Sequence, residues 1–183
     1  MIAVQIVLAT CSVRSWRASD AEALARHANN RNIWLNLRDV FPHPYTLRDA
    51  RAYLQFVKQP PETSFAIDVK GEAAGGIGFV LRPDVERVSA EVGYWLGETF
   101  WGRGIVTDAL KAITHHAVQT HQLTRLFAVP FAHNAASCRV LEKAGYVLEA
   151  RLRRSAVKNG VGVDQMQYAF IVPADPPQGE IPS

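Results

Sequence analysis

The stretch Glu91 to Leu110, EVGYWLGETFWGRGIVTDAL, decides the fold because it joins a strand, a glycine-bearing turn and a helix. Its first part, Glu91 to Leu96, is rich in aromatic and β-branched residues and has the length of a strand. Apolar residues recur at helical spacing from Ile105 to Ala117. Between them lies the turn Trp101 to Gly104, with two glycines one residue apart. The stretch therefore predicts a strand–turn–helix unit.

A glycine turn that opens a helix suits an anion. The first backbone N–H groups of a helix have no internal partner, and the helix dipole adds partial positive charge there. Glycine lets a phosphate approach the backbone, so the turn predicts a pyrophosphate site, with an ordinary strand-to-helix turn as the alternative. The sequence lacks the GxxxxGK[ST] pattern of a P-loop. Gly102 to Thr107 has no third glycine, which argues against a dinucleotide-binding fingerprint.

The composition is that of a soluble globular protein, with 48% hydrophobic and 20% charged residues. A length of 183 residues suits one domain with a full-sized core. The net charge of +3 is a small excess on scattered basic residues, which argues against nucleic-acid binding. The densest basic cluster, Arg151 to Arg154, can face a phosphate or lie on a solvated strand edge.

Cys11 and Cys138 are the only cysteines and form no CxxC motif, so we expect free thiols in a reducing compartment. The six histidines show no metal-binding spacing, and we expect no metal site. The opening segment MIAVQIVLA lacks the basic start and cleavage site of a signal peptide. No stretch has the length of a membrane span. These observations predict a cytoplasmic protein.

The pattern along the chain predicts seven strands and four main helices. We expect the strands at 4–16, 64–69, 73–81, 91–96, 125–129, 146–157 and 163–172, and the helices at 20–29, 47–58, from 105 onward and at 135–143. Consecutive strands without a helix between them favour antiparallel pairing, whereas the crossover from Glu91 to Val129 predicts a parallel pair. We expect one domain over residues 1–172 and a Pro-rich tail over 173–183.

Three segments together carry a family resemblance. EVGYWLGETFWGRGIVTDALKAI, then NAASCRVLEKAGYV, and upstream FPHPYT resemble the GNAT family of acyl-CoA-dependent N-acetyltransferases, especially its RimJ/RimL type, which acetylates ribosomal-protein N-termini. The resemblance implies an α/β (α+β) fold with a mixed, largely antiparallel sheet of about seven strands. It also implies a central splayed parallel pair and helices on both faces.

The resemblance further implies acetyl-CoA as co-substrate and direct acetyl transfer to a primary amine in a ternary complex. The acceptor is then a protein N-terminal α-amine or a small-molecule amine. The alternative is a non-catalytic acyl-CoA-binding or sensing module of the same fold. We expect a monomer or homodimer, with no nucleic acid, membrane or metal as partner.

The family turn reads Gln/Arg-x-x-Gly-x-Gly/Ala, and Gly102 and Gly104 match its glycines, while Thr99 departs from the Gln/Arg position. Asn134 and Ser137 match an Asn-x-x-Ser helix start, which in the family contacts the pantetheine amide and the thioester sulfur, although helix capping also explains both residues. The implied cofactor-binding residues are Tyr94, Trp95, Leu96, Trp101, Gly102, Arg103, Gly104, Ile105, Val106, Thr107, Asn134, Ser137 and Arg139.

The resemblance also assigns catalytic roles. Glu91 matches a strand glutamate that acts as base in some family members, directly or through water; alternatively it faces solvent or pairs with Arg87 or Arg125. Ser137 is the general-acid candidate, with Tyr146 as the alternative. The acceptor is expected across the sheet from the cofactor, in a site walled by Trp34, Phe41, His43, Tyr45 and the predicted hairpin turn at 158–160. The alternative is that the aromatic residues form a packed lid.

Overall fold

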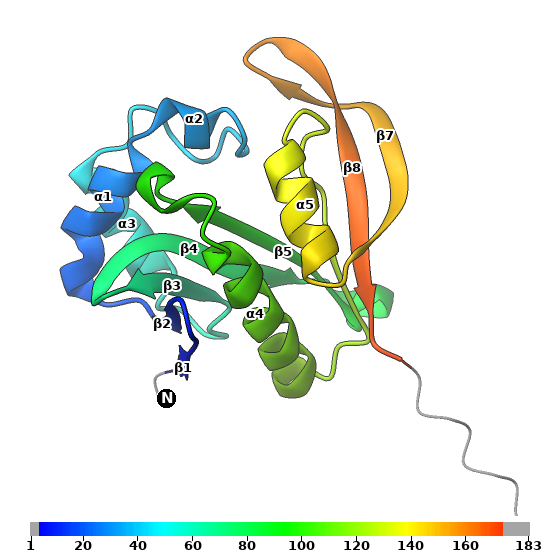
Figure 1. Ribbon diagram of the computed structural model, residues 1–183, viewed down its shortest axis with the longest axis horizontal. Helices are drawn as coiled ribbons and strands as arrows, with labels where there is room; N and C mark the ends of the chain where they lie inside the picture. The colour runs from blue at the N-terminus through cyan, green and yellow to red at the C-terminus, as the bar shows by residue number, and fades with distance from the viewer. Residues whose placement is uncertain (1–3, 174–183) are drawn as a thin grey trace, which may run out of the picture.

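Eight strands form one sheet in residues 4–173, which the computed structural model describes (Figure 1). Their order across the sheet is β1-β2-β3-β4-β5-β6-β8-β7. The strands are β1 (Gln5–Val7), β2 (Ser12–Ser15), β3 (Ser64–Val69), β4 (Glu72–Leu81), β5 (Ser89–Leu96), β6 (Arg125–Ala128), β7 (Val147–Lys158) and β8 (Val161–Ile171). The helices are α1 (Ala21–Ala28), α2 (Arg31–Trp34), α3 (Leu47–Phe56), α4 (Ile105–His121) and α5 (Ala135–Lys143).

The eighth strand comes from the start of the chain, where the sequence predicts one strand over 4–16. The structure divides that stretch into the antiparallel strands β1 and β2. The backbone N–H of Leu8 donates to the carbonyl of Cys11 at 2.9 Å and closes the turn between them. Ala9 and Thr10 occupy this turn, and neither is a residue that signals one. Most of the predicted tail, residues 174–183, lies outside the described residues.

The two faces of the sheet carry separate hydrophobic clusters, as side-chain alternation in β3 shows. Phe65 and Ile67 belong to the cluster that contains the buried residues of α4 and α5. Ala66, between them, belongs to the cluster that contains Leu24 of α1 and Leu54 of α3. Successive strand residues point to opposite faces, so helices cover both faces, as predicted (Figure 1).

The central parallel pair is short, and this creates the splay that the resemblance implies. β5 pairs with β6 over three positions, the last being Glu91 opposite Phe127. Beyond β6 the chain turns to β8 instead, where the N–H of Met166 donates to the carbonyl of Pro130 at 2.9 Å. β5 continues from Val92 to Leu96 on β4 alone among the described strands. One backbone edge of β5 is therefore free of a strand partner there.

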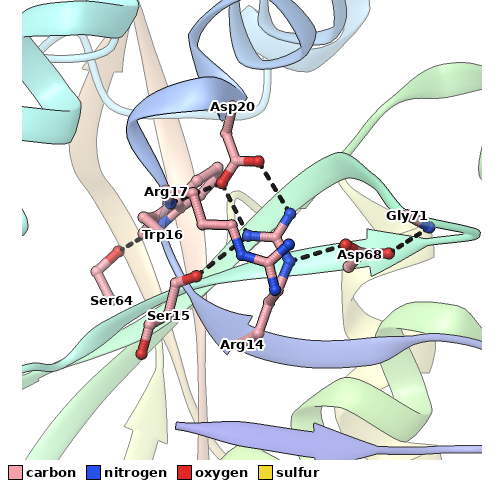
Figure 2. A network of polar contacts seen from close by, with 8 residues as sticks. All are labelled: Arg14, Ser15, Trp16, Arg17, Asp20, Ser64, Asp68 and Gly71. Atoms are coloured by element: carbon pink, nitrogen blue, oxygen red, sulfur yellow. Dashed lines mark hydrogen bonds and ion pairs between the residues drawn. The ribbon is translucent and has the colours of Figure 1, made fainter. Parts of the chain in front are cut away.

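A buried ion network fixes the start of the α1 layer on the sheet (Figure 2). The Arg14 side chain, 3% exposed, donates from Nε to Asp68 at 2.8 Å and from Nη1 and Nη2 to Asp20 at 2.8 and 2.9 Å. Hydrogen bonding to Asp20 raises the pKa of Arg14. Asp20 also accepts from the backbone of Arg17, and Asp68 from that of Gly71. The network joins β2, β3 and the residues preceding α1.

Local signals account for the remaining element ends. Thr46 and Asp49 form a reciprocal capping box at the start of α3. Asn159 and Gly160 have positive φ angles of 51° and 75° at the β7–β8 turn, as an Asn-Gly hairpin requires. Within residues 4–173, no helix is both long and apolar enough to cross a bilayer.

Candidate active site

A cavity of about 500 Å³ opens where β5 and β6 separate. This volume lies within the range of small-molecule and cofactor sites. Five segments and one further residue line it: 32–38, β5 from Glu91, the turn and helix start 100–107, 128–131, the α5 region 134–143, and Gln165. The free edge of β5 and the glycine turn thus face one space.

Every catalytic and cofactor-binding residue predicted from the sequence lines this cavity. They are Glu91, Tyr94, Trp95, Leu96, Trp101, Gly102, Arg103, Gly104, Ile105, Val106, Thr107, Asn134, Ser137 and Arg139. Lys143 lines it as well. The fold therefore gathers two motifs that are separated along the chain into one site.

The glycine turn has the form of an anion site. Gly102 and Gly104 both have φ of 76°, a left-handed conformation that strains other residues. The first helical hydrogen bond of α4 runs from Asp108 N–H to the Gly104 carbonyl at 3.1 Å. The three amides before it, at 105–107, therefore have no acceptor within the helix. Gly104 supplies no side-chain cap, so these amides are available to a phosphate.

Thr99, the departure from the family turn, contributes its carbonyl instead of its side chain. The Arg103 guanidinium donates to the Thr99 carbonyl at 2.8 Å and lies 5.7 Å from the centre of the Phe100 ring. The indole N–H of Trp101 donates to the Leu96 carbonyl at 2.7 Å. These contacts hold the turn against the end of β5.

Tyr94 and Ser137 meet inside the cavity. The Tyr94 hydroxyl lies 2.8 Å from Ser137 Oγ and 3.2 Å from the Ser137 carbonyl. The backbone N–H of Ser137 donates to Asn134 Oδ1 at 3.1 Å, so Asn134 caps α5. Burial raises the pKa of Tyr94, which keeps its hydroxyl protonated at neutral pH. Sequence reasoning assigned Tyr94 only a backbone role, although it shares a strand face with Val92 and Leu96, which pack toward α4 and α5.

Glu91 is ion-paired, but not with the arginines named from the sequence. Its side chain is 16% exposed and contacts Arg38 and Arg82, the latter at 3.2 Å. Arg125 pairs with Glu149 instead. A proton transferred to Glu91 must therefore displace contacts with two guanidinium groups.

Tyr146, the alternative acid, lies in the core. Its hydroxyl is 2.7 Å from Thr114 Oγ1 on α4, and burial raises its pKa to about 12. Tyr146 is absent from the cavity lining of the described residues. Of the two acid candidates, Ser137 is the one that lines the cavity.

The four aromatic residues predicted to wall the acceptor site pack in pairs. Trp34 stacks on His43, with ring centres 5.6 Å apart, and the Lys158 ammonium lies 3.8 Å from the centre of the Trp34 ring. Phe41 and Tyr45 pack at 4.8 Å. Within residues 4–173 the cavity lining omits all four. The residues of this region that line the cavity are Asn32, Ile33, Asn36, Leu37 and Arg38, here called the cavity wall. No motif marks these residues in the sequence.

Polar contacts anchor this wall at both ends. Glu98, just before the glycine turn, accepts from Asn30 at 2.6 Å and from Asn32 at 3.0 Å. At the other end, Lys158 of the β7–β8 hairpin is 4% exposed and donates to Asp39 at 2.7 Å. The wall is thereby tied to the turn and to the hairpin.

A family comparison agrees with this geometry. Residues 12–147, more than half of the chain, match the model of the acetyltransferase (GNAT) domain. The chain belongs to the GNAT acetyltransferase family. This confirms the resemblance predicted from the sequence and the GNAT fold described above.

Curated relatives of this GNAT chain carry acetyltransferase names. The ribosomal-protein-serine acetyltransferase of Escherichia coli (strain K12) is 34% identical over 108 residues, which cover 59% of this chain and 60% of the relative. The probable N-acetyltransferase YjcK of Bacillus subtilis (strain 168) is 36% identical over 87 residues, 48% of each chain. The matches thus span between about half and 60% of these relatives.

Solved GNAT structures match over nearly the whole chain. RimL, a ribosomal L7/L12 alpha-N-protein acetyltransferase in complex with coenzyme A, has a TM-score of 0.82 at 25% identity, covering 93% of this chain and 98% of RimL. The microcin C7 self-immunity acetyltransferase MccE, in complex with acetyl-CoA and AMP, has a TM-score of 0.79 at 23% identity. The match covers 90% of this chain and 94% of MccE. The second match supports the fold alone.

The described part of the chain contains no cluster of three or more His, Cys, Asp and Glu residues placed to hold a metal ion. Cys11 and Cys138 are both free.

Proposed function

We propose that this GNAT protein transfers the acetyl group of acetyl-CoA directly to the primary amine of a protein N-terminus. One observation carries the proposal: a single cavity presents free helix amides, the unpaired edge of β5 and the Ser137 hydroxyl. The ribosomal-protein acetyltransferases among its relatives support a protein N-terminus over a small-molecule amine as acceptor.

The cavity fits the parts of acetyl-CoA, which supplies the acetyl group as an activated thioester. The amides at 105–107 bind the pyrophosphate, since they lack helical acceptors and lie at the positive end of α4. The free edge of β5, from Val92 to Leu96, offers backbone groups to the amides of the pantetheine arm. Arg139 and Lys143 line the same cavity from α5 and provide positive charge for the outer phosphates.

One side chain accepts a proton in the reaction and another donates one. As the amine attacks the acetyl carbon, the new C–N bond forms, the C–S bond breaks and one amine proton must leave. Glu91 receives this proton through a water molecule, because Arg38 and Arg82 hold its carboxylate oxygens. Ser137 donates a proton to the departing sulfur and regains one from water, while Glu91 returns its proton to water, so both groups are restored. When Tyr94 donates to Ser137 Oγ, the serine hydrogen is free to point toward that sulfur.

The reaction needs no covalent acetyl-enzyme. Cys138, next to Ser137 in α5, is the nearest thiol in sequence, but burial raises its pKa and keeps it in the unreactive thiol form. Transfer within a ternary complex therefore accounts for the site. Two free thiols also fit the reducing cytoplasm, where we place the reaction.

The test measures acetylation of unblocked peptides by free-thiol release and mass spectrometry, and acetyl-CoA affinity by calorimetry. Ser137→Ala should lower kcat by about 100-fold, the usual contribution of general acid–base catalysis, with acetyl-CoA affinity unchanged. Tyr94→Phe should lower kcat without raising either KM. If Tyr94 acts through Ser137, the double variant should be no slower than Ser137→Ala alone.

The chain contains a matched control for this pair. Tyr53 and Ser64 form the same hydroxyl contact at 2.7 Å, in the hydrophobic cluster of α1 and α3 and outside the lining of the cavity. Tyr53→Phe and Ser64→Ala should leave kcat unchanged. Acetyl-CoA binding without transfer to any acceptor would support the sensing alternative. A protein that fails to bind acetyl-CoA overturns the proposal.

A further inference from the structure

Gly93 is the third of the six β5 residues that line the cavity, Glu91 to Leu96. Side chains alternate along a strand, so Gly93 shares its face with Glu91 and Trp95. Trp95 packs against the hydrophobic cluster of α1 and α3, and Glu91 contacts Arg38 of the cavity wall. Gly93 therefore faces the wall segment 32–38, opposite to the face on which Tyr94 meets Ser137.

The fold gives no reason for a glycine at position 93. Gly93 has no left-handed φ angle, and a Cβ built on it meets no heavy atom of residues 4–173 within 4 Å beyond its chain neighbours. The glycines of the adjacent strand β4 behave differently. A Cβ at Gly76 would lie 2.8 Å from Trp95 Nε1, and one at Gly78 would lie 2.5 Å from the Thr63 carbonyl. Glycine inside a strand lowers stability, so Gly93 is destabilising at a position where packing does not require a glycine.

The space above Gly93 has fixed sides. Glu91 is held by Arg38 and Arg82. Trp95 packs edge-on against Phe41, with ring centres 5.8 Å apart. Glu91 and Trp95 are four residues apart, about 13 Å along the strand, and only position 93 lies between them on this face, so the gap between their side chains accommodates one small group. Neither neighbour can fill it without breaking its own contacts.

We propose that Gly93 is a specificity-determining residue that admits the substituent on the carbon bearing the reacting amine. This inference rests on the proposed acetylation of N-terminal α-amines. The position lies beside Glu91, the proton acceptor, and on the acceptor face of the strand. A side chain at position 93 and a side chain on the first residue of the acceptor compete for the same space.

The experiment compares Gly93→Ala and Gly93→Val with the wild-type protein on peptides that differ only in their first residue: Gly, Ala, Ser, Val or Leu. Gly93→Ala should lower kcat/KM for peptides beginning with Ala or Ser by about 10-fold or more relative to the Gly peptide, the usual effect of one methyl group in a shaped pocket. The loss should appear mainly as a higher KM for the acceptor peptide. Gly93→Val should cause a larger loss than Gly93→Ala. Acetyl-CoA affinity should not change, and Tm should stay the same or rise.

Gly162 offers the matched control. It is also a strand glycine, in β8, with no left-handed φ and no described heavy atom within 4 Å of an added Cβ, and it does not line the cavity. Gly162→Ala should leave the peptide profile unchanged.

The outcomes separate the two proposals. An unchanged first-residue profile in the Gly93 variants, or an equal loss for all peptides, overturns the role of Gly93 and leaves the acetyltransferase proposal standing. A loss of acetyl-CoA affinity in Gly93→Ala overturns the role as well, because it places position 93 on the cofactor side. Wild-type protein that acetylates none of the peptides overturns both.

Discussion

Replacing Arg14 by methionine should be among the most destabilising single changes in this protein. The substitution keeps a long side chain but removes the guanidinium that bonds to Asp20 and Asp68 (Figure 2). Each carboxylate then keeps a backbone partner, Arg17 N–H or Gly71 N–H, but loses its counterion in a site almost closed to water.

The size of the effect follows from burial. Removing one partner of a buried ion pair costs about 3–5 kcal/mol, because the remaining charge is left uncompensated. For a domain of this length the loss corresponds to a fall in Tm of about 6–20 °C. Urea unfolding followed by circular dichroism measures the free energy, and a thermal scan measures Tm.

Arg151 supplies the matched control. Its Nε lies 2.8 Å from Asp164, the same separation as Arg14 Nε from Asp68, but its side chain is 63% exposed. An exposed pair contributes about 0–1 kcal/mol, so Arg151→Met should have little effect. Equal losses for the two variants would refute the argument from burial. Changing Asp20 and Asp68 to Asn in the Arg14→Met background should recover part of the stability, because no unpaired charge remains.

Two further predictions concern the glycine turn and the pH range. Gly104→Ala should cost about 1–2 kcal/mol of stability, because alanine is strained at φ 76°, and should also weaken acetyl-CoA binding. Gly160 has φ 75° in the hairpin turn and serves as the control. Gly160→Ala should cost similar stability but leave the acetyl-CoA affinity measured by calorimetry unchanged. Burial lowers the pKa of His116 and His121 from 6.5. Below pH 6.5 the unfolded chain therefore binds more protons than the folded chain, and the free energy of unfolding decreases as the pH is lowered. Urea midpoints between pH 8 and 5 should therefore decrease, and His121→Leu should flatten the profile; an identical slope in that variant would rule out His121 as a source.

The sequence predicts those parts of the structure that depend on neighbouring residues. The left-handed glycines of the turn, the Thr46 cap and the Asn159-Gly160 hairpin each follow from the chemistry of a few consecutive residues. The β1–β2 turn was missed because its residues carry no turn preference and tertiary pairing decides its position.

Contacts between distant segments could not be predicted in this way. Glu91 and Arg38 are 53 residues apart, and Lys158 and Asp39 are 119 apart. Their meeting depends on how the helices dock on the sheet, which no local pattern encodes. The cavity lining follows the same rule: among the described residues it includes five residues of segment 32–38, which no local pattern marks, and omits the four aromatic residues predicted to wall the acceptor site.

Under the proposed function, the unpaired edge of β5 should couple the lifetime of the protein to the supply of its co-substrate. A ligand that binds the folded chain alone stabilises it by mass action, by about 2.7 kcal/mol when its free concentration is a hundredfold above Kd. In the proposed complex, acetyl-CoA lies along Val92 to Leu96, the part of β5 that lacks a second strand partner among the described strands. When acetyl-CoA is scarce, more of the protein is unbound and opens more often, and proteases that cleave opened chains should remove it faster. Its abundance in a cell should then follow the acetyl-CoA level without any dedicated regulator.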